Sequence, residues 1–267
     1  MGTRALAPVL LFAVVLAPAA LASEPPAAAA AFAEAKLLVV EGDLAQAEAA
    51  FDRALALSTQ GSDAAYVLLE KAQLLEHRAQ MSRDRAQRAG FLARAVESLA
   101  EARRLAPDNL DVLRTTGAVK IDLAAGGDSG AVAEARAAYE ALLAHDPTDA
   151  EAALTLGRIY LADDQTGRAI DVLRRLIDKV PQHRMAYALL VEALLRAGRF
   201  TDAEGTLAEM IGFDPASLEA RLTLADLQLR RGDAKAAKAT LRAAPKEAQE
   251  DPRLQQALTR ILEKQPD

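Results

Sequence analysis

Apolar or small residues between positions 150 and 183 recur every three or four residues, in two blocks separated by a short polar stretch. These positions are Ala153, Leu156, Gly157 and Tyr160 in the first block and Ala169, Leu173 and Leu176 in the second. Such spacing is the period of one face of an α-helix. The segment therefore predicts two antiparallel helices, joined by a turn near residues 163–167 and ending before Pro181, whose ring interrupts helical hydrogen bonding.

The same pattern returns along the chain with a period of 34 residues. Three columns share this spacing: Pro147, Pro181 and Pro215; Ala135, Ala169, Ala203 and Ala237; and Tyr139, Leu173, Leu207 and Leu241. Gly198 and Gly232 repeat at the same interval, each just before the second helix of its block. A fixed period of this length indicates a solenoid, in which each helix pair buries its apolar face by stacking on the next pair.

These columns resemble the tetratricopeptide repeat. The clearest copy matches that pattern at Leu156-Gly157, Tyr160, Ala169, Leu173 and Pro181. The next copy departs from it, because Val191 and Leu194 stand where glycine and tyrosine are usual. The resemblance implies an all-α fold, a right-handed α-solenoid of helix-turn-helix repeats with a C-terminal capping helix. It also implies a concave groove lined by the first helix of each repeat.

Six repeat units and a cap account for nearly all of the chain after residue 22. We expect the units at about residues 28–61, 62–109, 110–149, 150–183, 184–217 and 218–247, and the capping helix at 251–264. The third unit carries six extra residues, which the glycine-rich stretch 126–130 accommodates as a turn. In the second unit the polar, arginine-rich segment 80–87 indicates either lengthened helices or an extended loop.

The N-terminus has the features of a secretory signal peptide at residues 1–22. Arg4 is followed by an apolar run over residues 6–16, and Ala20-Leu21-Ala22 is a typical cleavage signature. We therefore expect an exported, periplasmic protein whose mature chain covers residues 23–267. Because this interpretation depends on the shortness of the apolar run, an uncleaved segment that tethers the protein to the inner membrane is the alternative.

Composition excludes several classes of protein. The 267 residues include 51% hydrophobic and 26% charged types, an ordinary globular balance. The net charge of -6, with basic residues scattered among acidic ones, argues against nucleic-acid binding. The absence of cysteine excludes disulfides and thiolate metal sites.

No arrangement of residues indicates catalysis, a metal or a cofactor. His77, His145 and His183 are far apart and lack neighbouring ligands, so we interpret them as solvated residues. The glycine cluster 126–130 lacks the lysine of a phosphate-binding loop. We expect a protein that is not an enzyme.

The resemblance places candidate partner-binding positions on the first helix of each of the last three units. These positions are Leu154, Arg158, Leu161, Met185, Glu192, Leu195, Arg196, Leu222, Asp226, Leu229 and Arg230. Leucines with alternating charges would suit an amphipathic helix or an extended peptide. The alternative is that Leu161, Leu195 and Leu229 pack against neighbouring helices and that the charges are merely solvated.

The leading hypothesis is a scaffold or adaptor of the cell envelope that binds a protein or peptide partner in the groove. A second hypothesis is a self-associating or membrane-tethered subunit of an envelope assembly, secretion or export complex. In that case the terminal stripe Leu254, Leu258, Ile261 and Leu262 would pair with another copy. The sequence leaves the partner and the oligomeric state open.

Overall fold

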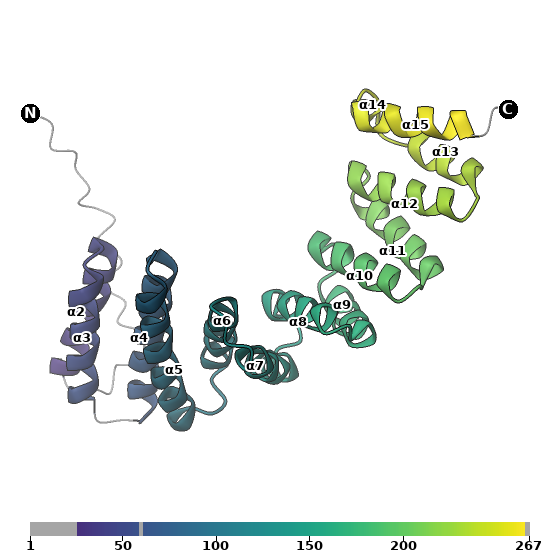
Figure 1. Cartoon of the computed structure of the whole chain (residues 1–267). Coiled ribbons are helices and arrows are strands. Elements are labelled where there is room, and N and C mark those ends of the chain that lie inside the picture. The colour runs from purple at the N-terminus through teal and green to yellow at the C-terminus, as the bar shows by residue number, and fades with distance from the viewer. Residues whose placement is uncertain (1–25, 59–60, 265–267) are drawn as a thin grey trace, which may run out of the picture. The chain divides into compact units, whose positions relative to one another are not determined.

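A computed structural model describes residues 26–58 and 61–264 as helices joined by short turns (Figure 1). The predicted signal peptide, residues 1–22, lies outside the described residues. Within the described ranges no helix has the length and apolarity needed to cross a bilayer. The chain divides into two compact units, which meet in sequence between His145 and Asp146 and are described separately.

Unit 1 contains three consecutive helix pairs. Its helices are α2 (Pro26–Glu41), α3 (Leu44–Leu57), α4 (Gly61–Met81), α5 (Arg85–Leu105), α6 (Leu110–Ala125) and α7 (Ala131–His145). The helices of each pair, α2 with α3, α4 with α5 and α6 with α7, pack along each other. Because α4 and α5 each have 21 residues and are separated only by residues 82–84, the arginine-rich segment lengthens the helices and does not form an extended loop.

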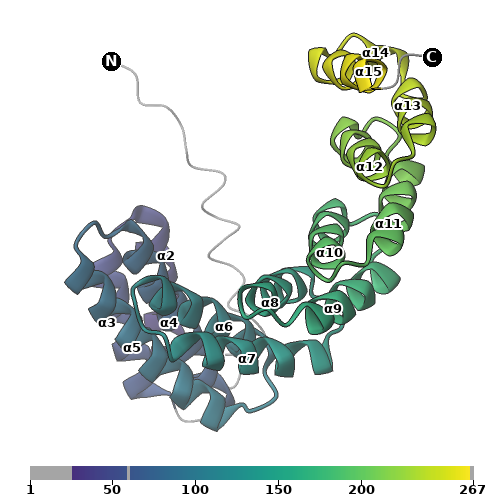
Figure 2. The ribbon, with the colours of Figure 1, turned by 45° about the vertical axis from the view of Figure 1, so that its right-hand side comes forward.

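Unit 2 continues the same arrangement. Its helices are α8 (Ala150–Ala162), α9 (Thr166–Lys179), α10 (Arg184–Arg196), α11 (Phe200–Phe213), α12 (Leu218–Arg230), α13 (Ala234–Arg242), α14 (Lys246–Gln249) and α15 (Pro252–Lys264). The first helices α8, α10 and α12 follow one another along one edge, and the second helices α9, α11 and α13 follow along the other (Figure 2). The terminal helix α15 packs against α12 and α13. The predicted all-α solenoid of helix pairs with a capping helix is confirmed.

The first helices of unit 2 begin with a repeated N-cap. The side chains of Asp149, His183 and Ser217, spaced by 34 residues, accept hydrogen bonds from backbone N–H groups three residues later, at 2.8, 3.3 and 3.3 Å. Such caps satisfy donors that the helix itself leaves unpaired. At the opposite ends, Gly198 and Gly232 have φ values of +69° and +85°, a conformation that favours glycine. Local sequence therefore defines where all three first helices start and where α10 and α12 stop.

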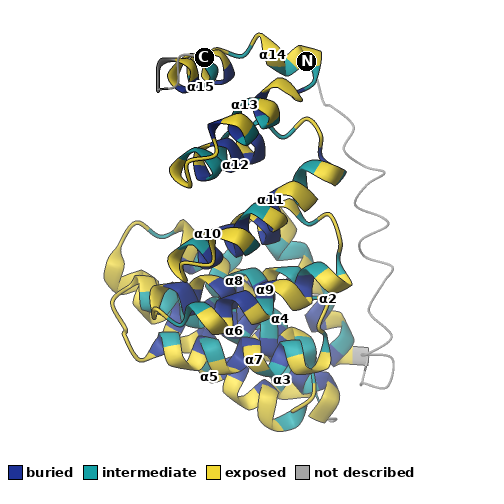
Figure 3. Ribbon diagram, turned by 90° about the vertical axis from the view of Figure 1, so that its right-hand side faces the viewer, coloured by how far each residue is buried: buried dark blue, intermediate teal, exposed yellow. Residues whose placement is uncertain are grey.

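The repeating columns form the core between paired helices. Ala135, Ala169, Ala203 and Ala237 are all fully buried, and the aromatic or leucine column that follows them is at most 3% exposed. Figure 3 shows buried residues on the helix faces turned toward neighbouring helices. Small residues at these positions let the helix backbones approach closely, so the core is built mainly from alanine and leucine.

Candidate partner-binding surface

The eleven predicted positions all lie on α8, α10 and α12, and together we call them the α8–α10–α12 surface. Its apolar members differ widely in exposure. Leu161 is only 4% exposed, whereas Met185 is 49% exposed. Leu154, Leu195, Leu222 and Leu229 are half-buried. Leu161 is thus part of the core, and the other apolar side chains keep part of their surface in contact with solvent.

The charged members of this surface form a pattern that repeats on α10 and α12, the first helices of two successive helix pairs. Arg196 donates to Glu192 at 2.7 Å, and Arg230 donates to Asp226 at the same distance. Both pairs join residues four apart on one helix, a spacing that brings side chains together on the helix surface. Because all four residues are exposed, these pairs add little stability and stay accessible to a ligand.

Arg196 has a second contact that sequence reasoning did not anticipate. Its Nη1 donates to the backbone oxygen of Leu161 at 3.0 Å, in the last turn of α8. That oxygen also accepts a long hydrogen bond from the backbone N–H of Asp164 at 3.4 Å, so the guanidinium is an additional donor at the end of α8 and links α10 to α8. A change at Arg196 would therefore affect both surface charge and packing, whereas Arg230 contacts just the exposed Asp226 among the described polar groups.

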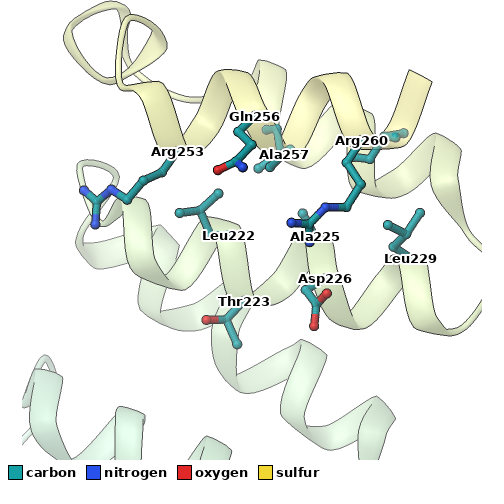
Figure 4. A pocket seen from close by; sticks show the side chains of 11 residues that line it. Leu222, Thr223, Ala225, Asp226, Leu229, Arg253, Gln256, Ala257 and Arg260 are labelled. Carbon is teal, nitrogen blue, oxygen red and sulfur yellow. The ribbon is translucent and has the colours of Figure 1, made fainter. Parts of the chain in front are cut away.

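A cavity of about 370 Å³ lies where the surface ends, between α12 and α15. Leu222, Asp226 and Leu229 line it from α12, and Arg253, Gln256 and Arg260 line it from α15 (Figure 4). The structure therefore brings three of the predicted positions together in one pocket. Residues from the capping helix complete this pocket.

The pocket combines an apolar floor with a positive rim. Ala225, Leu241 and Ile261 also line it and are buried. Arg260 makes no ion pair within the described residues, and Figure 4 shows its side chain extending toward Asp226. Arg253 pairs with Asp251 at 3.0 Å, and this hydrogen bond lowers the pKa of the Asp251 carboxyl. Because Arg253 is paired with Asp251 and Asp226 with Arg230, Arg260 supplies the unpaired charge of this lining among the described residues, and this positive group suits an acidic ligand group.

Sequence reasoning missed the pocket residues on α15, because it considered only the apolar stripe of that helix. Leu254 and Ile261 of the stripe are buried within the chain itself, while Leu262 is 44% exposed. The polar residues Arg253, Gln256 and Arg260 at intervals of three and four could have indicated a second face of the same helix. Their position opposite α12 follows only from the packing.

The histidines have different surroundings. His183 is half-buried, and its Nδ1 accepts the capping hydrogen bond of α10. His77 and His145 are exposed. Across the described ranges no three histidine or carboxylate side chains converge in a way that could hold a metal ion.

Comparison with solved structures finds similar helix-pair folds at low sequence identity. A tetratricopeptide repeat protein from Parabacteroides merdae ATCC 43184 has a TM-score of 0.58 and 18% identity, covering 91% of this chain and 88% of that one. YrrB, described as a TPR protein with an unusual peptide-binding site, has a TM-score of 0.53 and 17% identity, with 73% and 92% covered. PilW, described as a widely conserved type IV pilus biogenesis factor, has a TM-score of 0.51 and 21% identity, covering 88% of this chain and 99% of that one. These likenesses show the fold.

Family models extend the comparison to the sequence itself. No curated protein matches the chain. A tetratricopeptide repeat model matches residues 128–194, 160–213 and 194–261, which together span half of the chain, and a second such model matches residues 32–82. The chain therefore belongs to the tetratricopeptide repeat family.

Proposed function

We propose that this protein is a non-catalytic scaffold that binds a peptide or helix of a partner protein along the α8–α10–α12 surface. The observation that carries the proposal is the pocket between α12 and α15, where that surface ends. Stacked helix pairs commonly serve as extended binding surfaces. The pocket adds a defined place in which one side chain of the partner would be held.

The chemistry of this surface suits an amphipathic partner. Half-buried leucines such as Leu222 and Leu229 offer apolar contact area, and the exposed pairs around them offer charges of both signs. Apolar anchors supply affinity when a helix or peptide enters a groove, while charges fix its orientation. YrrB, which shares the fold, is described as having a peptide-binding site, and this supports the same class of ligand here.

We place the protein in the cell envelope, exported to the periplasm. The signal-like N-terminus supports this location, and PilW, an envelope-related protein by its description as a pilus biogenesis factor, shares the fold. The alternative is an uncleaved segment that tethers the chain to the inner membrane. N-terminal sequencing of the protein from an envelope fraction decides between them, because cleavage predicts a chain beginning at Ser23 and tethering predicts retention of the preceding residues.

Site-specific photo-crosslinking tests the binding surface. A photoreactive residue at Gln256, which is exposed and lines the pocket, is compared with one at Lys235, which is exposed on α13. We expect a discrete adduct from position 256 in the envelope fraction, lost when Leu229→Glu introduces a charge into the apolar lining. Equal adducts from both positions, or an adduct that survives Leu229→Glu, would contradict a partner bound in this pocket.

Self-association is the competing function, and the same experiment addresses it. An adduct with the mass of two copies of the chain, together with a concentration-dependent mass in sedimentation, would show that the protein self-associates. The assembly-subunit hypothesis would then be preferred to the adaptor hypothesis. The terminal stripe offers little surface for such pairing, because Leu254 and Ile261 are already buried within unit 2. We therefore expect the adduct to contain a different protein.

A further inference from the structure

Two segments that are distant in sequence meet in unit 1 at the ends of its longest helices. The arginine-rich turn between α4 and α5 lies against the glycine-rich turn between α6 and α7, because Arg85 Nη2 donates to the backbone oxygen of Gly126 at 2.6 Å. Together the two turns surround a cavity of about 450 Å³. Nothing in the proposed function uses this cavity.

Three arginines line the cavity, and none of them pairs with a carboxylate in residues 26–58 and 61–264. Arg85 and Arg88 donate to backbone oxygens, of Gly126 at 2.6 Å and of Ser82 at 2.8 Å, and Arg83 makes no ion pair or hydrogen bond within the described residues. A guanidinium has five N–H donors, so a single bond to a carbonyl leaves most of them available. No described residue therefore neutralises the charges of these three side chains.

Neighbouring arginines on the same helices show the contrast. Arg78 on α4 and Arg94 on α5 both form ion pairs with Glu48, a buried carboxylate on α3. Their role is to join three helices. Arg83, Arg85 and Arg88 lie beyond this network and are exposed.

The acidic groups around the cavity are already engaged in capping or hydrogen bonding. Asp84 accepts from the backbone N–H of Gln87 at 2.9 Å, and Asp128 accepts from that of Gly130 at 3.0 Å. Of these two carboxylates only Asp128 lines the cavity, which therefore presents three positive groups and one negative group. The excess of positive charge occurs in a chain whose net charge is -6.

The floor of the cavity is apolar. Leu92, which is 1% exposed, and the half-buried Leu123 lie beneath the arginines. Gly127, with φ +109°, keeps the site open, since a Cβ there would lie 3.1 Å from Arg85 Nη2. A ligand that fits this lining has a negative group next to an apolar group.

We propose that this arginine pocket binds an acidic segment of a protein partner, with Glu or Asp carboxylates on the guanidinium groups and an adjacent apolar side chain on Leu92 and Leu123. Guanidinium and carboxylate form paired, charge-assisted hydrogen bonds. The apolar floor favours a protein segment over an isolated phosphate, and the carboxylate of Asp128 disfavours a doubly charged anion more than a singly charged one. The pocket lies in unit 1, so it is a second contact site that does not depend on the α8–α10–α12 surface.

Fluorescence anisotropy with a defined probe tests the proposal on the full mature chain. The probe is a labelled peptide of sequence Gly-Glu-Leu-Glu-Glu-Leu-Glu-Gly, and its control has glutamine in place of every glutamate. The triple variant Arg83→Gln, Arg85→Gln, Arg88→Gln removes the site. A matched variant, Arg103→Gln, Arg175→Gln, Arg242→Gln, changes the net charge equally at exposed arginines that form no ion pair with any described residue.

We expect the glutamate peptide to bind at least tenfold more tightly than the glutamine peptide, in a manner weakened by salt, as charge-assisted contacts require. The pocket variant should lose roughly tenfold or more in affinity, and the matched variant less than about threefold. Arg83→Gln alone removes no hydrogen bond among the described residues, so it tests the site without the risk of a folding defect in the triple variant. It should weaken peptide binding by about threefold.

Three results would overturn the proposal. Equal losses of peptide affinity in both triple variants would show that binding depends on the overall charge of the protein and not on this pocket. Tighter binding of inorganic phosphate than of the peptide would assign the pocket to phosphate. Binding of phosphatidylglycerol vesicles that is lost in the pocket variant, without peptide binding, would assign it to a membrane surface.

Discussion

The close approach of α6 and α7 at Gly117 gives the sharpest prediction about stability. A Cβ at Gly117 would lie 2.5 Å from Cζ and 2.6 Å from Cε1 of Tyr139. Carbon atoms in contact prefer a separation of about 3.5–4.0 Å, so Gly117→Ala requires the ring to move by about 1 Å. Tyr139 is only 3% exposed, which leaves the ring little space to move into.

The magnitude follows from two opposing effects. Overpacking of a core typically costs about 1–3 kcal/mol, and the replacement of glycine by alanine within a helix returns about 1 kcal/mol. Because the overlap is severe, we expect Gly117→Ala to lower the free energy of unfolding by about 1–2 kcal/mol. Gly90→Ala on α5 is the matched control, since a Cβ there meets no atom within 4 Å. The free energy of unfolding of this control variant should rise by about 0.5–1 kcal/mol.

Thermal unfolding by circular dichroism measures the two variants, and hydrogen exchange of the α6 and α7 amides locates the effect. Exchange matters because repeat proteins can unfold in parts, so one melting temperature does not describe every helix pair. We expect shifts of opposite sign, with faster exchange in α6 and α7 for Gly117→Ala only. A double variant with Tyr139→Leu, the residue type found at the equivalent Leu173, should recover part of the loss. A Gly117→Ala variant that melts as high as Gly90→Ala would refute the reasoning.

Two further predictions concern the core and the alkaline pH range. Glu48 is 7% exposed and pairs with both Arg78 and Arg94, which are themselves partly exposed. We expect Glu48→Ala to lower the free energy of unfolding of the α3, α4 and α5 region by roughly 1–3 kcal/mol in chemical denaturation. Burial, together with the carboxylate of Glu70, raises the pKa of Tyr66 to about 12. Since the unfolded tyrosine ionises near pH 10 and the folded one does not, stability should fall between pH 10 and about 12. Tyr66→Phe should flatten this part of the stability profile, and an unchanged slope would count against the assignment.

The sequence by itself determined the helix pairs and the residues between them. Helical spacing and the 34-residue period depend on local geometry, so the columns containing Ala169 and Leu173 predicted buried positions that the structure confirms. Glycine at Gly198 and Gly232 likewise predicted turns, because their positive φ is a local backbone property. The family could also be identified from these columns.

The candidate sites were only partly accessible to the same reasoning. Periodicity placed Leu161 and Leu229 at equivalent positions, yet Leu161 is 4% exposed and Leu229 is half-buried. The difference arises because the neighbours of each repeat are not identical. A repeating column of residues predicts which face of a helix is turned toward its neighbours. It does not predict how completely the next helix covers that face.

Only the tertiary structure decided which distant side chains share a cavity. It places Arg260 of α15 opposite Asp226 of α12, and it brings Arg85 within 2.6 Å of the backbone oxygen of Gly126, 41 residues away. Such meetings depend on helix lengths and on the packing of one pair against another, which local periodicity does not contain. The repeat pattern therefore determined the scaffold, while the two pockets arose where turns and helix ends from different repeats came together.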